Sequence, residues 1–182
     1  MIGIVLAGGR SRRFGSPKWQ ARYRGASFEE RARQTLVSTT TAQWSVVPSG
    51  MVTESYQLED AFEWRGMGPL AGIVTVMRQK PDDWYAVCAC DTPLLSSEVY
   101  ERLVLERDSR PVVAVADDRL HPLIALYPRS MLPRFEDALR RDERAVMPHV
   151  AAATVVTFDE RDWFKNVNTP SDYAAVLRKE VD

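Results

Sequence analysis

The sequence predicts an α/β fold, a three-layer α/β/α sandwich built on a mainly parallel sheet. Strand-like apolar runs alternate with helix-like segments along the 182 residues. Such alternation places helices on both faces of a parallel sheet, and right-handed crossovers complete the three layers. Hydrophobic residues make up 45% of the chain, which is ordinary for a protein with a sizeable core. Since no linker is long enough to divide the chain, we expect one domain over residues 1–182.

The elements follow from hydrophobic periodicity and from helix-start signals. Strands are predicted over 2–6, 44–48, 84–90, 111–116, 122–127 and 153–157, and helices over 28–38, 69–79, 96–107, 130–141 and 170–180. Ser96-Ser97-Glu98 offers an N-cap and an early acid, and Thr169 precedes a proline in the first helical turn. Residues 51–67 have no clear period, and we expect them to form a loop over the site.

Charge and hydropathy exclude several classes of protein. A formal net charge of −1 gives no long-range attraction to nucleic acid. No apolar run approaches the roughly 20 residues that span a bilayer. Met1-Ile2-Gly3 leads directly into the first predicted strand, so we expect no signal peptide. These features predict a cytoplasmic protein without nucleic-acid or membrane partners.

The two cysteines, Cys88 and Cys90, fall in a predicted buried strand. Residues i and i+2 on a strand point to the same face and lie about 7 Å apart, too far for an unstrained disulfide. A metal site would need further ligands that the neighbouring sequence lacks. We therefore expect two core thiols.

The segment after the first strand carries the clearest chemical signal. It reads Leu6-Ala7-Gly8-Gly9-Arg10-Ser11-Arg12-Arg13-Phe14-Gly15-Ser16-Pro17-Lys18. Glycines let the backbone approach an anion closely, and consecutive N–H groups in such a turn form an anion-binding concavity. Arg13 and Lys18 add positive charge and directed donors. The combination predicts a triphosphate-binding loop; the alternative is a basic surface turn.

This loop is neither a Walker A motif nor a dinucleotide fingerprint. Trp19 follows the lysine, and the glycine spacing differs from G-x-G-x-x-G. The pattern L-A-G-G-x-S-x-R-x-G-x-x-K resembles the signature of the small-molecule nucleotidyltransferases, and most of all that of the molybdenum cofactor guanylyltransferases. That resemblance implies a Rossmann-like sheet of the nucleotidyltransferase type, with Leu6, Ala7, Gly8, Gly9 and Lys18 at the nucleotide.

The second strong feature is Asp91, the first polar residue after a buried strand. Ligands of open α/β sheets lie beyond the carboxyl ends of the strands, so this carboxylate shares an edge with the glycine-rich loop. Mg²⁺ prefers a carboxylate together with phosphate oxygens and water. In the family that this chain resembles, the aspartate of C-D-x-P binds the metal, which places Mg²⁺ on Asp91. A simple turn-forming acid is the alternative.

The run Gly68-Pro69-Leu70-Ala71-Gly72-Ile73 predicts a tight turn into a helix, with N–H groups free to face a base or phosphate. It also matches a block of the same family. In that family an acid near the position of Asp60 reads the guanine edge, because a carboxylate accepts from both N1–H and N2–H. The alternative for Asp60 is that it is a solvated loop acid. The alternative for Gly72 is that it only allows the helix to pack closely against the sheet.

Two asparagines, Asn166 and Asn168, place their amides on one side of the chain before the last predicted helix. Asparagine is also a common turn and cap residue. The family resemblance implies that this N-x-N-T-P run borders the acceptor side. His121, in a segment similar to the family's H-P-L-x-A-L, is either an acceptor contact or a packing residue.

The resemblance implies an enzyme that transfers GMP from GTP to the terminal phosphate of molybdopterin and releases pyrophosphate. Arg13, Lys18 and Asp91 would be catalytic, Mg²⁺ would be the cofactor, and other cofactor-assembly proteins would be further partners. The nearest alternative is a relative that uses CTP or another nucleotide, such as a molybdopterin cytidylyltransferase. A non-catalytic GTP-binding partner in cofactor assembly is the alternative from another class.

Overall fold

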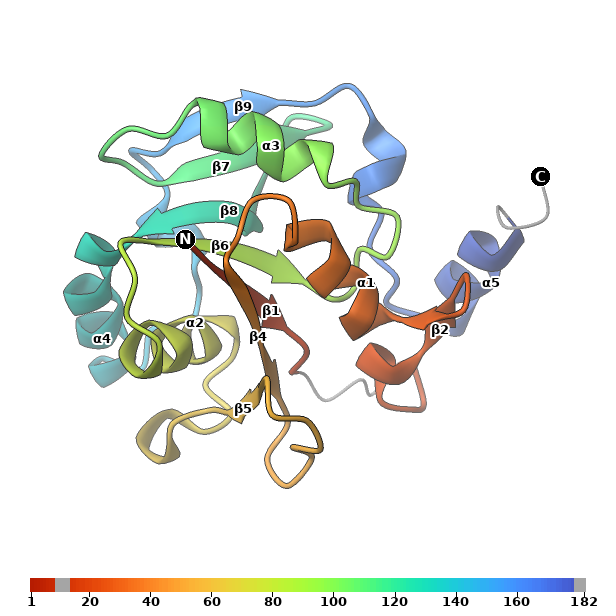
Figure 1. Cartoon of the computed structure of the whole chain (residues 1–182), viewed down its shortest axis with the longest axis horizontal. Helices are drawn as coiled ribbons and strands as arrows, with labels where there is room; N and C mark the ends of the chain where they lie inside the picture. The colour runs from red at the N-terminus through yellow and green to blue at the C-terminus, as the bar shows by residue number, and fades with distance from the viewer. Residues whose placement is uncertain (9–13, 179–182) are drawn as a thin grey trace.

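A central sheet organises the molecule. The computed structural model describes residues 1–8 and 14–178. The strands of its main sheet are β1 (Ile2–Leu6), β4 (Ala42–Val47), β5 (Gln57–Glu59), β6 (Trp84–Ala89), β7 (Val112–Ala116), β8 (Arg119–Pro128) and β9 (Thr154–Thr157). In the described residues they form a seven-stranded sheet of order β5-β4-β1-β6-β8-β7-β9 (Figure 1).

The sheet is mainly parallel, as the sequence predicts. Strands β5, β4, β1 and β6 run parallel to one another, and β9 runs parallel to β7, while β8 is antiparallel to both neighbours. The exception has a local cause. Only Asp117 and Asp118 connect β7 to β8, and both have positive φ angles, 50° and 56°. A two-residue turn of this kind produces a hairpin and therefore an antiparallel pair.

Helices cover both faces of the sheet and confirm the three layers (Figure 1). The helices are α1 (Phe28–Leu36), α2 (Pro69–Gln79), α3 (Glu98–Leu105), α4 (Leu132–Arg140) and α5 (Pro170–Arg178). Buried side chains of α1, α3 and α5 form one hydrophobic cluster with the sheet, and those of α2 and α4 form the other. Figure 1 also shows α5 at the side of the molecule, next to β2 (Arg22–Tyr23).

All six predicted strands and all five predicted helices are present with small shifts at their ends. The final residues of the predicted 170–180 helix lie outside the described residues. Two features were not predicted: strand β5, which lies within the expected loop 51–67, and the hairpin of β2 with β3 (Ala26–Ser27). These strands have two or three residues each, too few for a period to emerge.

The predicted helix starts and core thiols have clear structural counterparts. Thr169 Oγ1 accepts from Asp172 N at 3.2 Å, and Asp172 Oδ2 accepts from Thr169 N at 2.8 Å. Such a reciprocal pair caps the first turn of α5. At the start of α3, Ser96 Oγ accepts a hydrogen bond from Glu98 N at 3.3 Å. The two cysteines are buried as free thiols in the same hydrophobic cluster, as predicted.

Gly72 lets α2 lie close against the sheet. A Cβ atom at this position would lie 2.8 Å from Leu6 Cδ2 and 3.5 Å from Val46 Cβ. The first distance is shorter than a non-bonded carbon–carbon contact, so a larger residue here would require the Leu6 side chain to shift. The expectation of close helix–sheet packing at Gly72 is confirmed, and the contact brings the start of α2 over the ends of β1 and β4.

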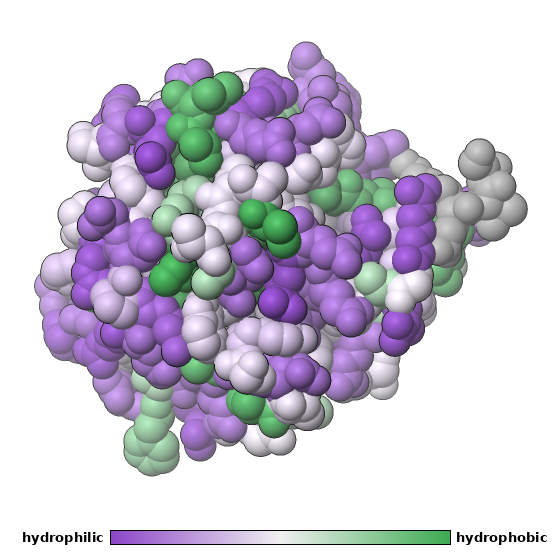
Figure 2. Space-filling model, viewed as in Figure 1, coloured by the Kyte–Doolittle hydropathy of each residue, from purple (hydrophilic) through white to green (hydrophobic). Residues whose placement is uncertain are grey.

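Figure 2 shows a mostly hydrophilic face on which hydrophobic residues form small, separate patches. None of the helices in the described part of the chain combines the length and the hydrophobicity needed to cross a bilayer.

Candidate active site

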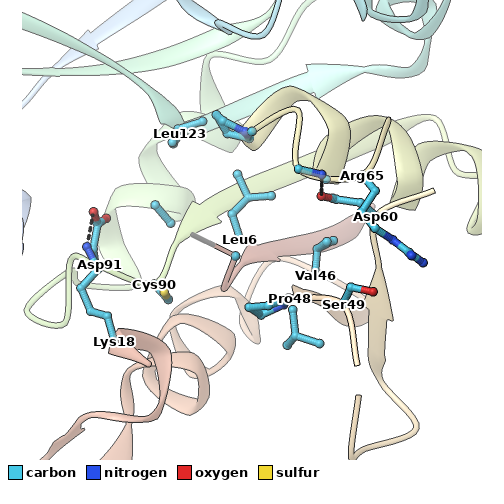
Figure 3. A pocket seen from close by; sticks show the side chains of 17 residues that line it. Leu6, Lys18, Val46, Pro48, Ser49, Asp60, Arg65, Cys90, Asp91 and Leu123 are labelled. Atoms are coloured by element: carbon cyan, nitrogen blue, oxygen red, sulfur yellow. Dashed lines mark hydrogen bonds and ion pairs between the residues drawn. The ribbon is translucent and has the colours of Figure 1, made fainter. Parts of the chain in front are cut away.

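A cavity of about 510 Å³ opens at the carboxyl ends of β1, β4 and β6. This size is typical of a small-molecule site, and its position at the strand ends is where α/β sheets bind ligands. Figure 3 shows Lys18 and Asp91 at one end of the cavity and Asp60 and Arg65 at the other. We call these the Lys18 end and the Asp60 end.

The Lys18 end joins three segments that are far apart in the sequence. Lys18 Nζ lies 3.1 Å from Asp91 Oδ2 and donates to Asn168 Oδ1 at 2.9 Å. The Lys18 and Asp91 side chains are 17% and 24% exposed, so a ligand in the cavity can reach both. The sequence predicted that the lysine and the carboxylate share one edge of the sheet, and the structure brings them into contact.

Backbone hydrogen bonds fix Asp91 in place. Cys90 N donates to Leu6 O at 3.2 Å, which continues the β1–β6 pairing by one residue. Asp91 O accepts from Val167 N at 2.8 Å. Because Val167 is fully buried, the flanking Asn166 and Asn168 are held at the surface beside the carboxylate.

At the Asp60 end, a carboxylate follows strand β5 directly. Asp60 Oδ2 accepts from Gly66 N at 3.2 Å, and the next residue, Ala61, donates its N–H to Thr75 Oγ1 of helix α2 at 2.9 Å. Burial raises the pKa of Asp60 above the usual aspartate range, partly offset by the Gly66 N–H and by Arg65. The carboxylate is therefore half-buried and oriented, rather than a solvated loop acid.

Apolar side chains form much of the wall between the two ends. Leu6, Val46 and Leu123 lie there, with Cys90 near the Lys18 end (Figure 3). Burial raises the pKa of the Cys90 thiol far above its usual range. The thiol therefore stays protonated and does not supply a nucleophile.

Two glycines, Gly8 and Gly68, contribute main-chain atoms rather than side chains to the cavity wall. Among the described residues, a Cβ atom at Gly8 would meet only Val46 O, at 3.9 Å, and the residue lines the cavity. Gly68 has a φ of +83°, a conformation that a residue with a side chain rarely adopts. Gly68 precedes Pro69, the first residue of helix α2, and both residues line the cavity.

The cavity gathers most, but not all, of the predicted nucleotide-site residues. Seven of them line it: Leu6, Gly8, Lys18, Asp60, Gly68, Pro69 and Asp91. Ala7 packs into the core, and the described cavity wall does not include Asn166 or Asn168, although Asn168 accepts a hydrogen bond from Lys18 of that wall. Gly9 and Arg13 lie outside the described residues, so the structure does not place them.

Several cavity residues were not predicted. They are Val46, Val47, Pro48, Ser49, Arg65, Gly66, Gly72, Ala89, Cys90 and Leu123. The group at 46–49 spans the end of β4, so its position at the carboxyl end of a predicted strand was a usable signal. Arg65 and Gly66 lie in the 51–67 segment, where the sequence has no period to indicate which side chains face inward.

The two histidines lie outside the cavity wall. His121 packs its ring 4.9 Å from that of Phe164, and burial lowers its pKa, which fits the packing alternative. His149 is buried against Phe135, with ring centroids 5.2 Å apart. Neither nitrogen of His149 has a hydrogen-bond partner among the described residues.

The donor set at the Lys18 end suits a divalent cation that is shared with phosphates. Within residues 1–8 and 14–178, no cluster of three or more His, Cys, Asp or Glu side chains forms a complete protein metal cage. Asp91 instead offers one accessible carboxylate beside a lysine and an amide. Mg²⁺ is commonly held by one or two carboxylates, with phosphates and water completing the shell.

The chain is similar to known proteins over most of its length. The MobA-like NTP transferase domain family matches residues 3–155. A protein of Bacillus cytotoxicus described as a probable molybdenum cofactor guanylyltransferase is 32% identical, with 97% of this chain and 96% of the relative aligned.

Solved structures share the fold. The molybdopterin-guanine dinucleotide biosynthesis protein A of Archaeoglobus fulgidus superposes with a TM-score of 0.79 at 23% identity, covering 100% of this chain and 99% of that one. A Mycobacterium tuberculosis protein solved in complex with manganese superposes with a TM-score of 0.70 at 12% identity, covering 97% of each chain.

Proposed function

Because the chain belongs to the MobA-like NTP transferase domain family, we propose that it transfers GMP from GTP to molybdopterin. The acceptor is the terminal phosphate of molybdopterin, with or without molybdenum. The products are the guanine dinucleotide form of the cofactor and pyrophosphate. The observation that carries the proposal is a single cavity with a cation–carboxylate pair at one end and a half-buried, oriented carboxylate at the other.

At the Lys18 end, the ammonium group binds the triphosphate and stabilises the charge of the departing pyrophosphate. Phosphate groups attract lysine as a compact positive charge with several donors. We further propose that Arg13 of the predicted triphosphate-binding loop supplies a second cation, and that backbone N–H groups of the predicted loop residues Gly8 and Gly9 donate to the phosphate oxygens. All of these residues belong to the predicted triphosphate-binding loop.

Asp91 is the residue that holds the divalent cation, which we propose to be Mg²⁺. Bound there, the ion supplies Lewis-acid stabilisation of the phosphate oxygens. Lys18 neutralises the carboxylate at 3.1 Å in this structure. With a divalent cation on Asp91, Lys18 would be available to bind the phosphates.

At the Asp60 end, the carboxylate accepts hydrogen bonds from N1–H and N2–H of guanine. A cytosine or adenine edge does not offer that pair of adjacent donors, so the interaction selects guanine. Gly66 N–H orients one carboxylate oxygen at 3.2 Å. Gly68 and Pro69 complete this part of the wall at the start of α2.

The acceptor approaches from the side of Asn166 and Asn168. Both residues are exposed and flank Val167, whose N–H donates to Asp91 O at 2.8 Å, so a ligand that enters from outside the nucleotide cavity can reach them. They donate to the acceptor phosphate and position it near the α-phosphorus of GTP. Other cofactor-assembly proteins would deliver molybdopterin to this enzyme or receive its product.

The reaction is a direct in-line displacement. An oxygen of the acceptor phosphate forms a bond to the α-phosphorus of GTP, and the bond from that phosphorus to the bridging oxygen of pyrophosphate breaks. Positioning and charge stabilisation suffice for such a transfer, so no covalent enzyme intermediate is required. A mechanism without a covalent intermediate is consistent with a Cys90 thiol that stays protonated.

The test is product formation from defined substrates. The purified chain, incubated with GTP, Mg²⁺ and molybdopterin, is expected to release pyrophosphate and to form the guanine dinucleotide in equal amounts. If molybdopterin reacts with CTP but not with GTP, the chain is a cytidylyltransferase. Tight GTP binding without pyrophosphate release would instead support a non-catalytic partner.

A further inference from the structure

Glu59 joins two segments that border the Asp60 end of the cavity. Its Oε2 accepts from Ser49 Oγ at 2.7 Å and from Arg65 Nη2 at 3.3 Å, and its Oε1 accepts from Gly50 N at 3.0 Å. Ser49 and Gly50 belong to the turn after β4, whereas Arg65 belongs to the loop between β5 and α2. One carboxylate therefore fixes the spacing of two separate parts of the cavity rim.

The turn after β4 is shaped to meet this carboxylate. Met51 N donates to Pro48 O at 3.0 Å, and Gly50 has a φ of +78°. The third position of such a turn favours glycine, because residues with a side chain rarely adopt a positive φ. The turn presents the hydroxyl of Ser49 and the N–H of Gly50 to the same partner. These two hydrogen bonds, with the charge of Arg65, lower the pKa of Glu59 and keep it ionised at neutral pH.

Glu59 also controls the charge at this end of the cavity. Among the residues that line the wall, Lys18 and Arg65 carry positive charge, and they lie at opposite ends (Figure 3). Each has a carboxylate partner, Asp91 for Lys18 and Glu59 for Arg65. Without its partner, Arg65 would be a second attractive position for a triphosphate at the end where the base belongs.

We propose that Glu59 is a positioning residue that makes the Asp60 end selective for the base. It holds the turn after β4 against the loop that carries Arg65 and Gly66, and it neutralises Arg65. The phosphates are thereby directed to the Lys18 end. This inference rests on the proposed function, since it assigns the Asp60 end to the base of the bound nucleotide.

The experiment measures kcat and KM for each nucleoside triphosphate with wild-type protein and with Glu59→Gln. Glutamine keeps the size of the side chain but removes its charge. We expect the KM for GTP to rise about tenfold, as when a charged hydrogen-bond partner is lost, while kcat stays within about twofold. The preference for GTP over ATP should fall by a similar factor, and inorganic triphosphate should become a stronger inhibitor.

Two further variants separate positioning from a general effect on the fold. Ser49→Ala removes one donor and is expected to raise the KM for GTP by a smaller factor in the same direction. Glu63→Gln is the matched control, because Glu63 lies on the same loop but pairs with Arg78 at 2.6 Å, outside the cavity. It should leave both constants unchanged. Thermal unfolding of each variant identifies any that fail to fold, and Ser49→Ala then carries the test.

A lower kcat with an unchanged KM in Glu59→Gln would overturn the inference, as would constants equal to those of Glu63→Gln. Wild-type protein that prefers another nucleotide would contradict the proposed guanine specificity alone. Glu59→Gln should then raise the KM for that other nucleotide. Wild-type protein that binds no nucleoside triphosphate would overturn both proposals.

Discussion

The two ends of the cavity are built in different ways. The Lys18 end combines residues from three distant segments, around positions 18, 91 and 168, which meet because strand ends and a buried valine fix them. The Asp60 end comes from one stretch, residues 48–69, in which short strands, turns and glycines are tied together by Glu59.

This contrast separates chemistry from selectivity. The parallel sheet rigidly supports the groups that act on phosphate, whereas loops support the groups that select the base. Loop residues can change without disturbing the sheet. Substitutions at the Lys18 end should therefore act on turnover and triphosphate affinity, and those at the Asp60 end on the choice of nucleotide.

The largest expected effect is that of Asp91→Asn. The amide cannot balance a divalent cation, so turnover should fall at least about 100-fold, the scale for losing one preorganised electrostatic group. Circular dichroism should match the wild type, because Asp91 O, which bonds Val167 N, is a backbone atom. Turnover close to the wild-type value would remove Asp91 from the mechanism.

Lys18→Ala should weaken GTP binding by about 10- to 100-fold, since a charge-assisted hydrogen bond is lost. Calorimetry with GTP and with guanosine distinguishes the two ends of the cavity. Because guanosine lacks phosphates, it should bind wild-type protein and Lys18→Ala with equal affinity. Lys165→Ala is the matched control, an exposed lysine that pairs with Asp162. Equal losses for GTP and guanosine would show that the two ends are not independent.

Asp60→Asn should reduce the preference for GTP over ATP by about tenfold, the low end of the discrimination given by one bidentate base contact. The turnover of saturating GTP should change little. A variant with full GTP preference would exclude Asp60 as the base-reading residue.

The pH dependence provides a second test of Asp60. Guanine recognition requires the ionised carboxylate, whose pKa burial raises above the usual aspartate range. As the pH falls through this raised pKa, protonation should weaken the preference for GTP, and it should do so at a higher pH than for an exposed aspartate. Asp60→Asn should not show this dependence, and a wild-type preference that is flat across the acidic range would contradict the assignment.

The smallest expected effect is that of Thr169→Ala, which removes the cap of α5 next to Asn168. Loss of such a cap costs about 1 kcal/mol, which lowers Tm by about 2–4 °C in a chain of this length. Turnover should fall only slightly, since Asn168 itself is retained. Ser171→Ala, one position into the helix, is the control, and an equal Tm change in both variants would exclude the capping explanation.

Most of the fold and the Lys18 end could be predicted from the sequence. Buried strands of five or six residues have strong apolar patterns, and a polar residue that directly follows such a strand must lie at its carboxyl edge. Asp91 is such a polar residue after a buried strand, and the segment that leads to Lys18 also follows a buried strand. Their approach to 3.1 Å follows from that topology.

The Asp60 end could be predicted only in part. Strand β5 has three residues, too few to establish a period, and it buries little apolar surface. Which side of the chain Glu59 and Asp60 face depends on the pairing of β5 with β4, which no local pattern indicates. The contact between Glu59 and the turn after β4 is a tertiary feature without a motif of its own.

The central claim is that one cavity binds GTP, with the base at Asp60 and the phosphates at Lys18 and Asp91. The most direct measurement is calorimetric titration of the protein with GTP, CTP, UTP and ATP, each with and without Mg²⁺. We expect GTP to bind most tightly, with a gain in affinity from Mg²⁺ that Asp91→Asn abolishes. Equal binding of all four nucleotides, or binding to none, would contradict the claim.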